Sequence, residues 1–338
     1  MGCISYFLFI YIIILYIIYI RMQRNEDVVK VDYVRTFCVC GDGDKDVVVG
    51  VKGDIMVWKE WSNKKNSKDG FVVVKAHDSY IYSLITICDN NINNNSNSNS
   101  TYLLSASNDK KIKVWLYEDY SLVHTLTEHT SSVISLTYNN ELHTLISSSA
   151  DNTICIWLIS FTPLITITKH KSILHTHIMF YATISTLPLT NNTLLITCGK
   201  SNTLYLYTSP SYTLHTTLQY HSSFIYSFIF NSSNNTIISI SNDESFIIYS
   251  LTSHKILLQH QTPFKTPTSL TQLIHHPSIA VSYNNGEIAI CNVSTLQITS
   301  IYKLQSECSI YIISYSSTTN SIYYTTLNGL SKWTNIYV

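Results

Sequence analysis

Histidine and aspartate recur as pairs along this 338-residue chain, at spacings that suit shared chemistry. The pairs are His77 with Asp109, His129 with Asp151 and His221 with Asp243, and they are 32, 22 and 22 residues apart. With a serine from a neighbouring strand, such a pair has the composition of the Ser-His-Asp triad of acyl-transfer enzymes. A catalytic triad occurs once and faces a cleft, whereas these pairs repeat. We therefore predict that the pairs are structural and that the protein is not an enzyme.

An aromatic residue follows each of these aspartates six positions later. A buried carboxylate must be paired, and an imidazole and an indole N–H are suitable donors. With a strand Ser or Thr, we predict three buried networks, formed by His77, Asp109 and Trp115, by His129, Asp151 and Trp157, and by His221, Asp243 and Tyr249. The tyrosine fills the volume of a tryptophan but matches its N–H donor poorly.

Short apolar strands that end in an aromatic residue, or a substitute for one, give the chain its period. They end at Trp58, Trp115, Trp157, Tyr207, Tyr249, Cys291 and Trp333, at intervals of 57, 42, 50, 42, 42 and 42 residues. The longest interval contains the Asn- and Ser-rich stretch 90–100, which we interpret as a low-complexity loop. A period of roughly 40–45 residues predicts an all-β, seven-bladed β-propeller with blades of four antiparallel strands. Since the chain ends five residues after Trp333, we expect a strand near Val28–Val34 to complete the last blade and close the ring.

The segments LLSASNDKKIKVW and LISSSADNTICIW, which end at Trp115 and Trp157, resemble WD40 repeats, and the resemblance covers about Val28–Val338. In that family the His, the Ser or Thr, the Asp and the Trp form the buried network. The sequence departs from the family pattern at the aspartate position, which holds Lys52, Ser201, Asn285 and Leu327 in blades one, four, six and seven. The glycine expected before the blade histidine is replaced by Ala76, Glu128, Lys169 and Tyr220. Blades four, six and seven are therefore predicted from spacing alone.

The loops that join one blade's outer strand to the next blade's inner strand should ring the narrow face of the propeller. Three residues past each blade histidine lies a rim position, just before the inner strand. We predict a partner-binding rim at Tyr33, Tyr80, Ser132 and Phe224, with Ile173 as the corresponding residue of blade four. Aromatic residues clustered on one rim would act as interface anchors, while packing on neighbouring blade tops is the structural alternative.

The N-terminal run Ile4–Ile20 is apolar without interruption, and Arg21 and Arg24 follow it. Its 17 residues are at the short limit for a membrane-spanning helix. If it inserts, the positive-inside rule places the propeller in the cytoplasm. Alternatively, residues 1–21 are a gene-model extension and translation begins at Met22. We accordingly divide the chain into a hydrophobic segment, 1–23, and a propeller, 24–338.

Composition narrows the possible partners. The net formal charge is zero, whereas a general nucleic-acid binder usually has a basic excess, so we expect no nucleic-acid partner. Eight scattered cysteines form no CxxC pair and the thirteen histidines lack zinc-ligand spacing, so we predict no metal and no cofactor. Free cysteines in strands favour a reducing compartment, which indicates the cytoplasm, with the nucleus as a further location. Other proteins are the expected partners.

Two stretches are similar to a more specific family. VRTFCVCGDGDKDVVVGVKGDIMVWKEW with FVVVKAHDSYIYSL, and HSSFIYSFIF with SISNDESFIIYSL and VSYNNGEIAIC, resemble blades of phospholipase A-2-activating proteins. The resemblance implies ubiquitin binding by the propeller and work with an AAA+ unfoldase complex in ubiquitin-dependent turnover. Members of that family carry two further C-terminal domains, and this sequence stops after the propeller. The alternative function is a membrane-anchored scaffold of an unrelated pathway.

Overall fold

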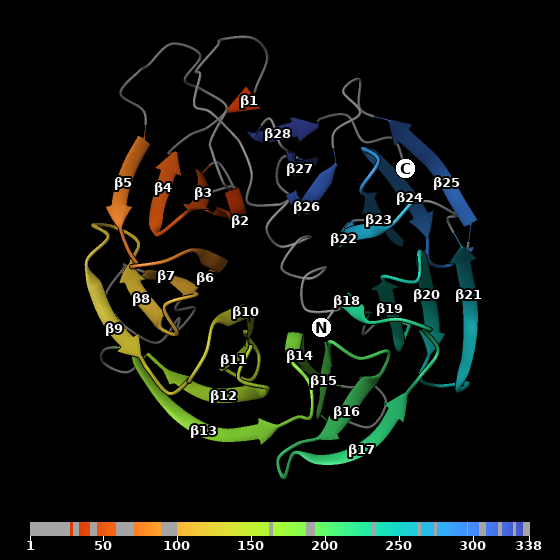
Figure 1. The fold of residues 1–338 in the computed structure, drawn as a ribbon, viewed down its shortest axis with the longest axis horizontal. Coiled ribbons are helices and arrows are strands. Elements are labelled where there is room, and N and C mark those ends of the chain that lie inside the picture. Colours follow the sequence, from red (N-terminus) through yellow and green to blue (C-terminus); the bar gives the residue numbers. More distant parts are fainter. Residues whose placement is uncertain are drawn as a thin grey trace, which may run out of the picture.

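A computed structural model describes residues 28–29, 34–40, 46–58, 71–88, 100–161, 165–186, 193–231, 234–261, 265–273, 276–295, 297–303, 309–316, 320–326 and 329–333. These residues form seven four-stranded antiparallel sheets, arranged as blades in a ring (Figure 1). The predicted all-β, seven-bladed propeller is confirmed. None of these residues forms a helix of the length and apolar character that crossing a bilayer requires. The segment 1–23 and residues 90–99 of the low-complexity stretch lie outside the described residues.

Within each blade the chain runs from an inner strand to an outer strand (Figure 1). Blades one to three are β2 (Val34–Cys40), β3 (Asp46–Val51), β4 (Asp54–Trp58) and β5 (Phe71–Lys75); β6 (Ile81–Cys88), β7 (Thr101–Ser107), β8 (Ile112–Leu116) and β9 (Leu122–Leu126); and β10 (Val133–Asn139), β11 (Thr144–Ser149), β12 (Thr153–Ser160) and β13 (Thr166–Leu174). Blades four and five are β14 (Met179–Thr186), β15 (Thr193–Gly199), β16 (Leu204–Thr208) and β17 (Thr213–Leu218); and β18 (Ile225–Asn231), β19 (Thr236–Ser241), β20 (Ser245–Ser250) and β21 (Lys255–Gln261). Blades six and seven are β22 (Pro267–Leu273), β23 (Ser278–Tyr283), β24 (Glu287–Asn292) and β25 (Gln297–Lys303); and β26 (Ile310–Ser316), β27 (Ser321–Thr326) and β28 (Gly329–Trp333), which β1 (Val28–Val29) completes.

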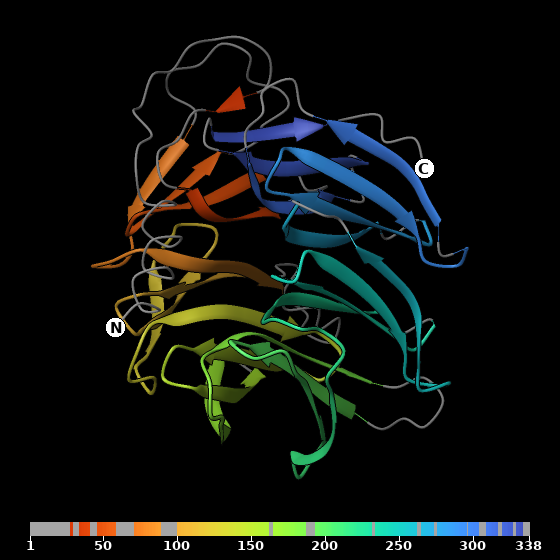
Figure 2. The same cartoon turned by 45° about the vertical axis from the view of Figure 1, so that its right-hand side comes forward.

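The ring is closed by the N-terminal strand, as the sequence predicts. β1 pairs antiparallel with β28, with Val28 opposite Ser331 and Val29 opposite Leu330. Figures 1 and 2 both show β1 lying beside β28, so the first and the last described strands share blade seven. Closure gives blade seven its fourth strand and removes a free sheet edge from the ring.

The core lies between blades, and a buried apolar cluster fills each of the seven seams. At the seam of blades two and three, for example, Leu104 and Val114 pack with Leu136 and Trp157. Because a blade has a neighbour on both faces, its second strand is buried on both sides, and all six residues of β11 are buried. Polar residues in such a strand must find partners inside the protein.

β11 meets this requirement with three consecutive serines. Ser148 Oγ donates to the Phe180 carbonyl at 3.2 Å, and Ser149 Oγ donates to the Ser132 carbonyl at 2.9 Å. Ser147 faces the imidazole of His129. The strand thus carries the polar groups that position the loop leading into its own blade.

Candidate functional site

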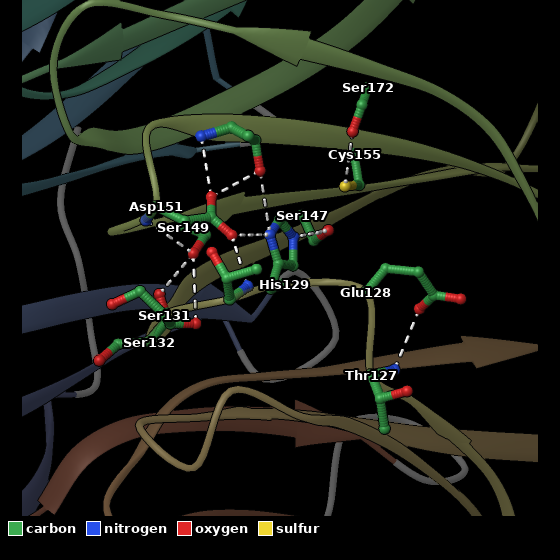
Figure 3. A network of polar contacts seen from close by, with 12 residues as sticks. Thr127, Glu128, His129, Ser131, Ser132, Ser147, Ser149, Asp151, Cys155 and Ser172 are labelled. Atoms are coloured by element: carbon green, nitrogen blue, oxygen red, sulfur yellow. Dashed lines mark hydrogen bonds and ion pairs between the residues drawn. The ribbon is translucent and has the colours of Figure 1, made fainter.

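A cluster of polar contacts surrounds His129 in blade three (Figure 3). His129 Nδ1 lies 3.0 Å from Asp151 Oδ2, and its Nε2 lies 2.8 Å from Ser147 Oγ. Trp157 Nε1 donates to the same Ser147 oxygen at 2.9 Å. Since the indole is only a donor, the hydroxyl accepts from Trp157 and donates to His129, which then donates from Nδ1 to the carboxylate.

Asp151 also fastens the loop before the inner strand. Its Oδ2 accepts the backbone N–H of Thr130 at 2.8 Å, while its Oδ1 accepts the N–H of Thr153 at 2.9 Å. The Thr153 hydroxyl adds a donor at 2.5 Å. Burial raises the pKa of Asp151, but the hydrogen bonds from Thr153 and Thr130, together with the neighbouring His129, outweigh it and hold the pKa at about 2. One ionised carboxylate therefore ties the loop, the turn and the imidazole together.

Blade two repeats this arrangement. His77 Nδ1 lies 2.8 Å from Asp109 Oδ2, its Nε2 lies 2.8 Å from Ser105 Oγ, and Trp115 Nε1 donates to Ser105 at 3.0 Å. Burial again raises the pKa of Asp109, but the hydrogen bond from His77 and those from the backbone of Lys111 and Asp78 more than offset it, so that the pKa is about 2.

Blade five has the same network with one substitution. His221 lies 2.9 Å from both Asp243 Oδ2 and Ser239 Oγ. Tyr249 occupies the tryptophan position and packs its ring on Tyr220, with 4.8 Å between ring centroids. The three networks bring together eight of the nine residues selected from the sequence, with the serines Ser105, Ser147 and Ser239, while Tyr249 contacts Tyr220 instead.

The Ser-His-Asp chemistry of these networks is closed to a substrate. Ser105 and Ser147 have no exposed surface and Ser239 is 3% exposed. In blades two and three the serine oxygen also accepts an indole N–H, which occupies a lone pair that a nucleophile needs. The triad atoms are therefore used to hold each blade to the loop before it.

Blade four contains a variant of the network that differs from the sequence prediction. The sequence places Lys169 at the glycine position of blade four and therefore His170 at its histidine position. Both residues lie instead within β13, the outer strand of blade three. His170 is the residue left out of the β12–β13 ladder between the pairs Trp157–Lys169 and Ile156–Lys171. The residue that stands four positions before the inner strand, as His129 does before β10, is His175, whose Nε2 lies 3.3 Å from the Tyr207 hydroxyl.

No carboxylate meets His175, because Ser201 stands at the aspartate position. Ser201 Oγ still accepts the N–H of Thr203, as Asp151 does that of Thr153. Thr197, at the network serine position, has a buried hydroxyl without a hydrogen-bond partner. Burial, together with the nearby charge of His177, lowers the pKa of His175 to about 4, so this imidazole is neutral at pH 7.

The rim residues of blades two, three and five lie where the sequence predicts. Tyr80, Ser132 and Phe224 each immediately precede an inner strand and are partly exposed. The assignment of Ile173 to the rim is wrong, because it pairs with Ile154 inside blade three; the equivalent residue is Ile178. Tyr33 lies outside the described residues.

Polar clusters that the sequence analysis missed support this rim. Asn108 Nδ2 donates to Ser79 Oγ at 2.8 Å, and its Oδ1 accepts from Ser132 Oγ at 2.6 Å and from the Tyr82 hydroxyl at 3.4 Å. Ser132 is therefore bonded within the protein. Blade five repeats the cluster, with Asn242 bonded to Ser223 at 3.3 Å and to Tyr226 at 2.7 Å. The sequence does contain a signal for these clusters, since both asparagines lie in the same pattern, Ser-x-Ser-Asn-Asp, at 105–109 and 239–243.

The fold and the networks define a seven-bladed β-propeller with a His-Ser-Asp-Trp network in blades two and three and variants of it in blades four and five. The profile of the WD domain, G-beta repeat, matches residues 71–115 and 120–157, so these two segments are similar to WD40 repeats. Both matches begin at or next to the outer strand of one blade and end at the tryptophan of the following blade. Each sequence repeat thus links two neighbouring blades. A WD40 propeller suggests a protein-interaction scaffold.

Proposed function

We propose that this protein is a non-enzymatic scaffold that binds another protein on the face formed by the loops before the inner strands. The observation that carries the proposal is the repeated rim of blades two and five. Tyr80 and Phe224 occupy the same position in the two blades, are partly exposed, and stand beside the same Ser-Asn-Tyr cluster. Large aromatic side chains on a rigid support are typical anchors of protein interfaces.

The buried networks explain why this rim suits recognition. In both blades the loop begins at a network histidine and a backbone N–H of the loop donates to the network aspartate, from Asp78 at 3.3 Å and from Ser222 at 2.9 Å. The residue before each aspartate donates its N–H to the rim carbonyl, Asn108 to Tyr80 and Asn242 to Phe224. A loop fixed in this way loses little conformational entropy on binding, which favours affinity.

For the partner, we propose ubiquitin, with an AAA+ unfoldase complex downstream and the cytoplasm as the place of action. Support comes from the resemblance of blades one, two, five and six to phospholipase A-2-activating proteins, because these stretches include both rim aromatics. The enzymatic alternative lacks support in the networks, whose serines are buried.

A titration of ¹⁵N-labelled ubiquitin with the purified protein tests the proposal by NMR. We expect shifts confined to one face of ubiquitin, and we expect Phe224→Asp or Tyr80→Asp to abolish them. Leu214→Asp is the matched control, because Leu214 is 53% exposed on the outer strand β17 and should leave binding intact. If the ubiquitin shifts persist in both rim variants, ubiquitin binds outside the proposed rim. If no shift is seen, ubiquitin is not the partner, and proteins retained by the wild type but lost by both rim variants would identify it.

A further inference from the structure

The outer strand of blade one differs from the outer strands of blades two to six. In β9, β13, β17, β21 and β25 the pairing with the preceding strand shifts register at one point and leaves a residue out of the ladder. Those residues are Val123, His170, His215, Leu257 and Thr299. β5 instead pairs with β4 in unbroken register from Phe71 to Lys75. Bulges twist a sheet edge and hinder pairing with another chain, and β5 lacks this protection.

β5 also lacks the second common protection, which is charge. Its sequence is FVVVK, so four consecutive residues are uncharged and the only charge stands at its end. Val72 is 42% exposed and Val73 is 47% exposed, although consecutive strand residues point to opposite faces. An exposed, regular and apolar edge strand is a template for the addition of a further strand.

We propose that β5 pairs antiparallel with β5 of a second copy of this chain, so that two blades form one continuous eight-stranded sheet. The surface lies on the perimeter of the ring, so this inference goes beyond the proposed partner site on the face. A two-fold axis through Val73 sets Val72 against Val74 of the other copy and Val73 against itself.

The sequence of β5 is compatible with a second copy of itself as this occupant. In the two-fold register Lys75 stands opposite Phe71, so no like charges meet and the two lysines lie at opposite ends of the new ladder. β-branched residues in directly opposed pairs are among the best cross-strand partners. The sequence of β5 is therefore complementary to itself in the antiparallel orientation.

Sedimentation velocity on the purified full-length protein tests the inference. We expect a concentration-dependent dimer. Val73→Lys and Val73→Glu should each weaken it by roughly tenfold or more, because the two-fold axis sets like charges against each other. An equimolar mixture of the two variants should restore the dimer, since the new ammonium then faces the new carboxylate.

Restoration of the dimer by mixing the two variants would distinguish pairing at β5 from association through another surface and from misfolding. Leu214→Lys, on the bulged strand β17, is the matched control and should dimerise like the wild type. A wild type that stays monomeric at all concentrations overturns the inference. So does a dimer that ignores both Val73 substitutions, or a mixture that stays as monomeric as its components.

Discussion

Blades three and four are neighbours with the same strand order, yet their networks differ at one position. In blade three Asp151 meets His129 at 3.0 Å and fastens the Thr130 amide at 2.8 Å. In blade four Ser201 takes the place of the carboxylate, and the Thr197 hydroxyl is left buried without a hydrogen-bond partner. Both blades keep four strands and a filled seam, so the network is not needed to form a blade.

The carboxylate instead determines the electrostatics and the anchoring of the loop before the blade. With it, an ionised group accepts N–H bonds from two backbone segments as well as from the imidazole. Without it, burial and the neighbouring His177 leave His175 with a pKa of about 4. The comparison indicates that apolar seams give the fold, and the polar networks fix the loops of the proposed binding face.

The largest effect is expected from Asp151→Ala. Removing this carboxylate strands the buried imidazole of His129 and the Thr130 amide, which should lower the free energy of unfolding by roughly 2–4 kcal/mol. Thermal and urea denaturation measure the loss. Ser201→Ala in blade four is the matched control and should change stability by less than about 0.5 kcal/mol. Equal effects of the two substitutions would contradict the distinction between the blades.

A smaller, pH-dependent effect should come from His175. Its pKa is about 4 in the folded protein and 6.5 ordinarily, so the unfolded chain binds a proton first as the pH falls. The stability contributed by the neutral imidazole is present above pH 6.5 and is lost between pH 6.5 and about 4. The stability that ionised Asp151 contributes is lost only at lower pH, between pH 3.8 and about 2. Urea denaturation of His175→Gln at pH 7, 5.5 and 4.5 should show a flatter profile than the wild type, and parallel profiles would disprove the assignment.

Ser201→Asp should increase the free energy of unfolding, because it supplies the carboxylate that blade four lacks. Thr203 already donates its N–H to Ser201, as Thr153 does to Asp151, so the new carboxylate has a donor in place. We expect the pKa of His175 to rise and the protein to gain about 1 kcal/mol at pH 7. Asn202→Asp, one residue away, should give no such gain. A neutral or destabilising Ser201→Asp would show that blade four holds its histidine differently.

The sequence predicts the ring and the three networks because both repeat with nearly constant spacing. The 22-residue interval from His129 to Asp151 recurs between His221 and Asp243. Ring closure follows from the missing outer strand of the last repeat, and β1 supplies it.

Blade four defeats the same reasoning because the interval from His175 to Ser201 is 26 residues and the aspartate is absent. From the sequence alone His170 resembles the blade histidine, but in the structure it is the bulged residue of β13. The Asn108 and Asn242 clusters were missed because their partners lie 24 to 29 residues, or 16 to 19 residues, away in sequence. Only the folded loops bring them together.

Hydrogen exchange of the loop amides compares the two kinds of blade at single positions. The amides of Thr130 and Ser222 donate to Asp151 and Asp243, and Thr176 is the equivalent residue of blade four, directly after His175. Because a hydrogen bond to a charged group contributes about 1.5–3 kcal/mol, Thr130 and Ser222 should exchange roughly tenfold or more slowly than Thr176, and Asp151→Ala should remove the protection of Thr130 but not that of Ser222. Equal exchange at the three amides, or protection of Thr130 that survives Asp151→Ala, would contradict the conclusion that the networks fix the loops of the proposed binding face.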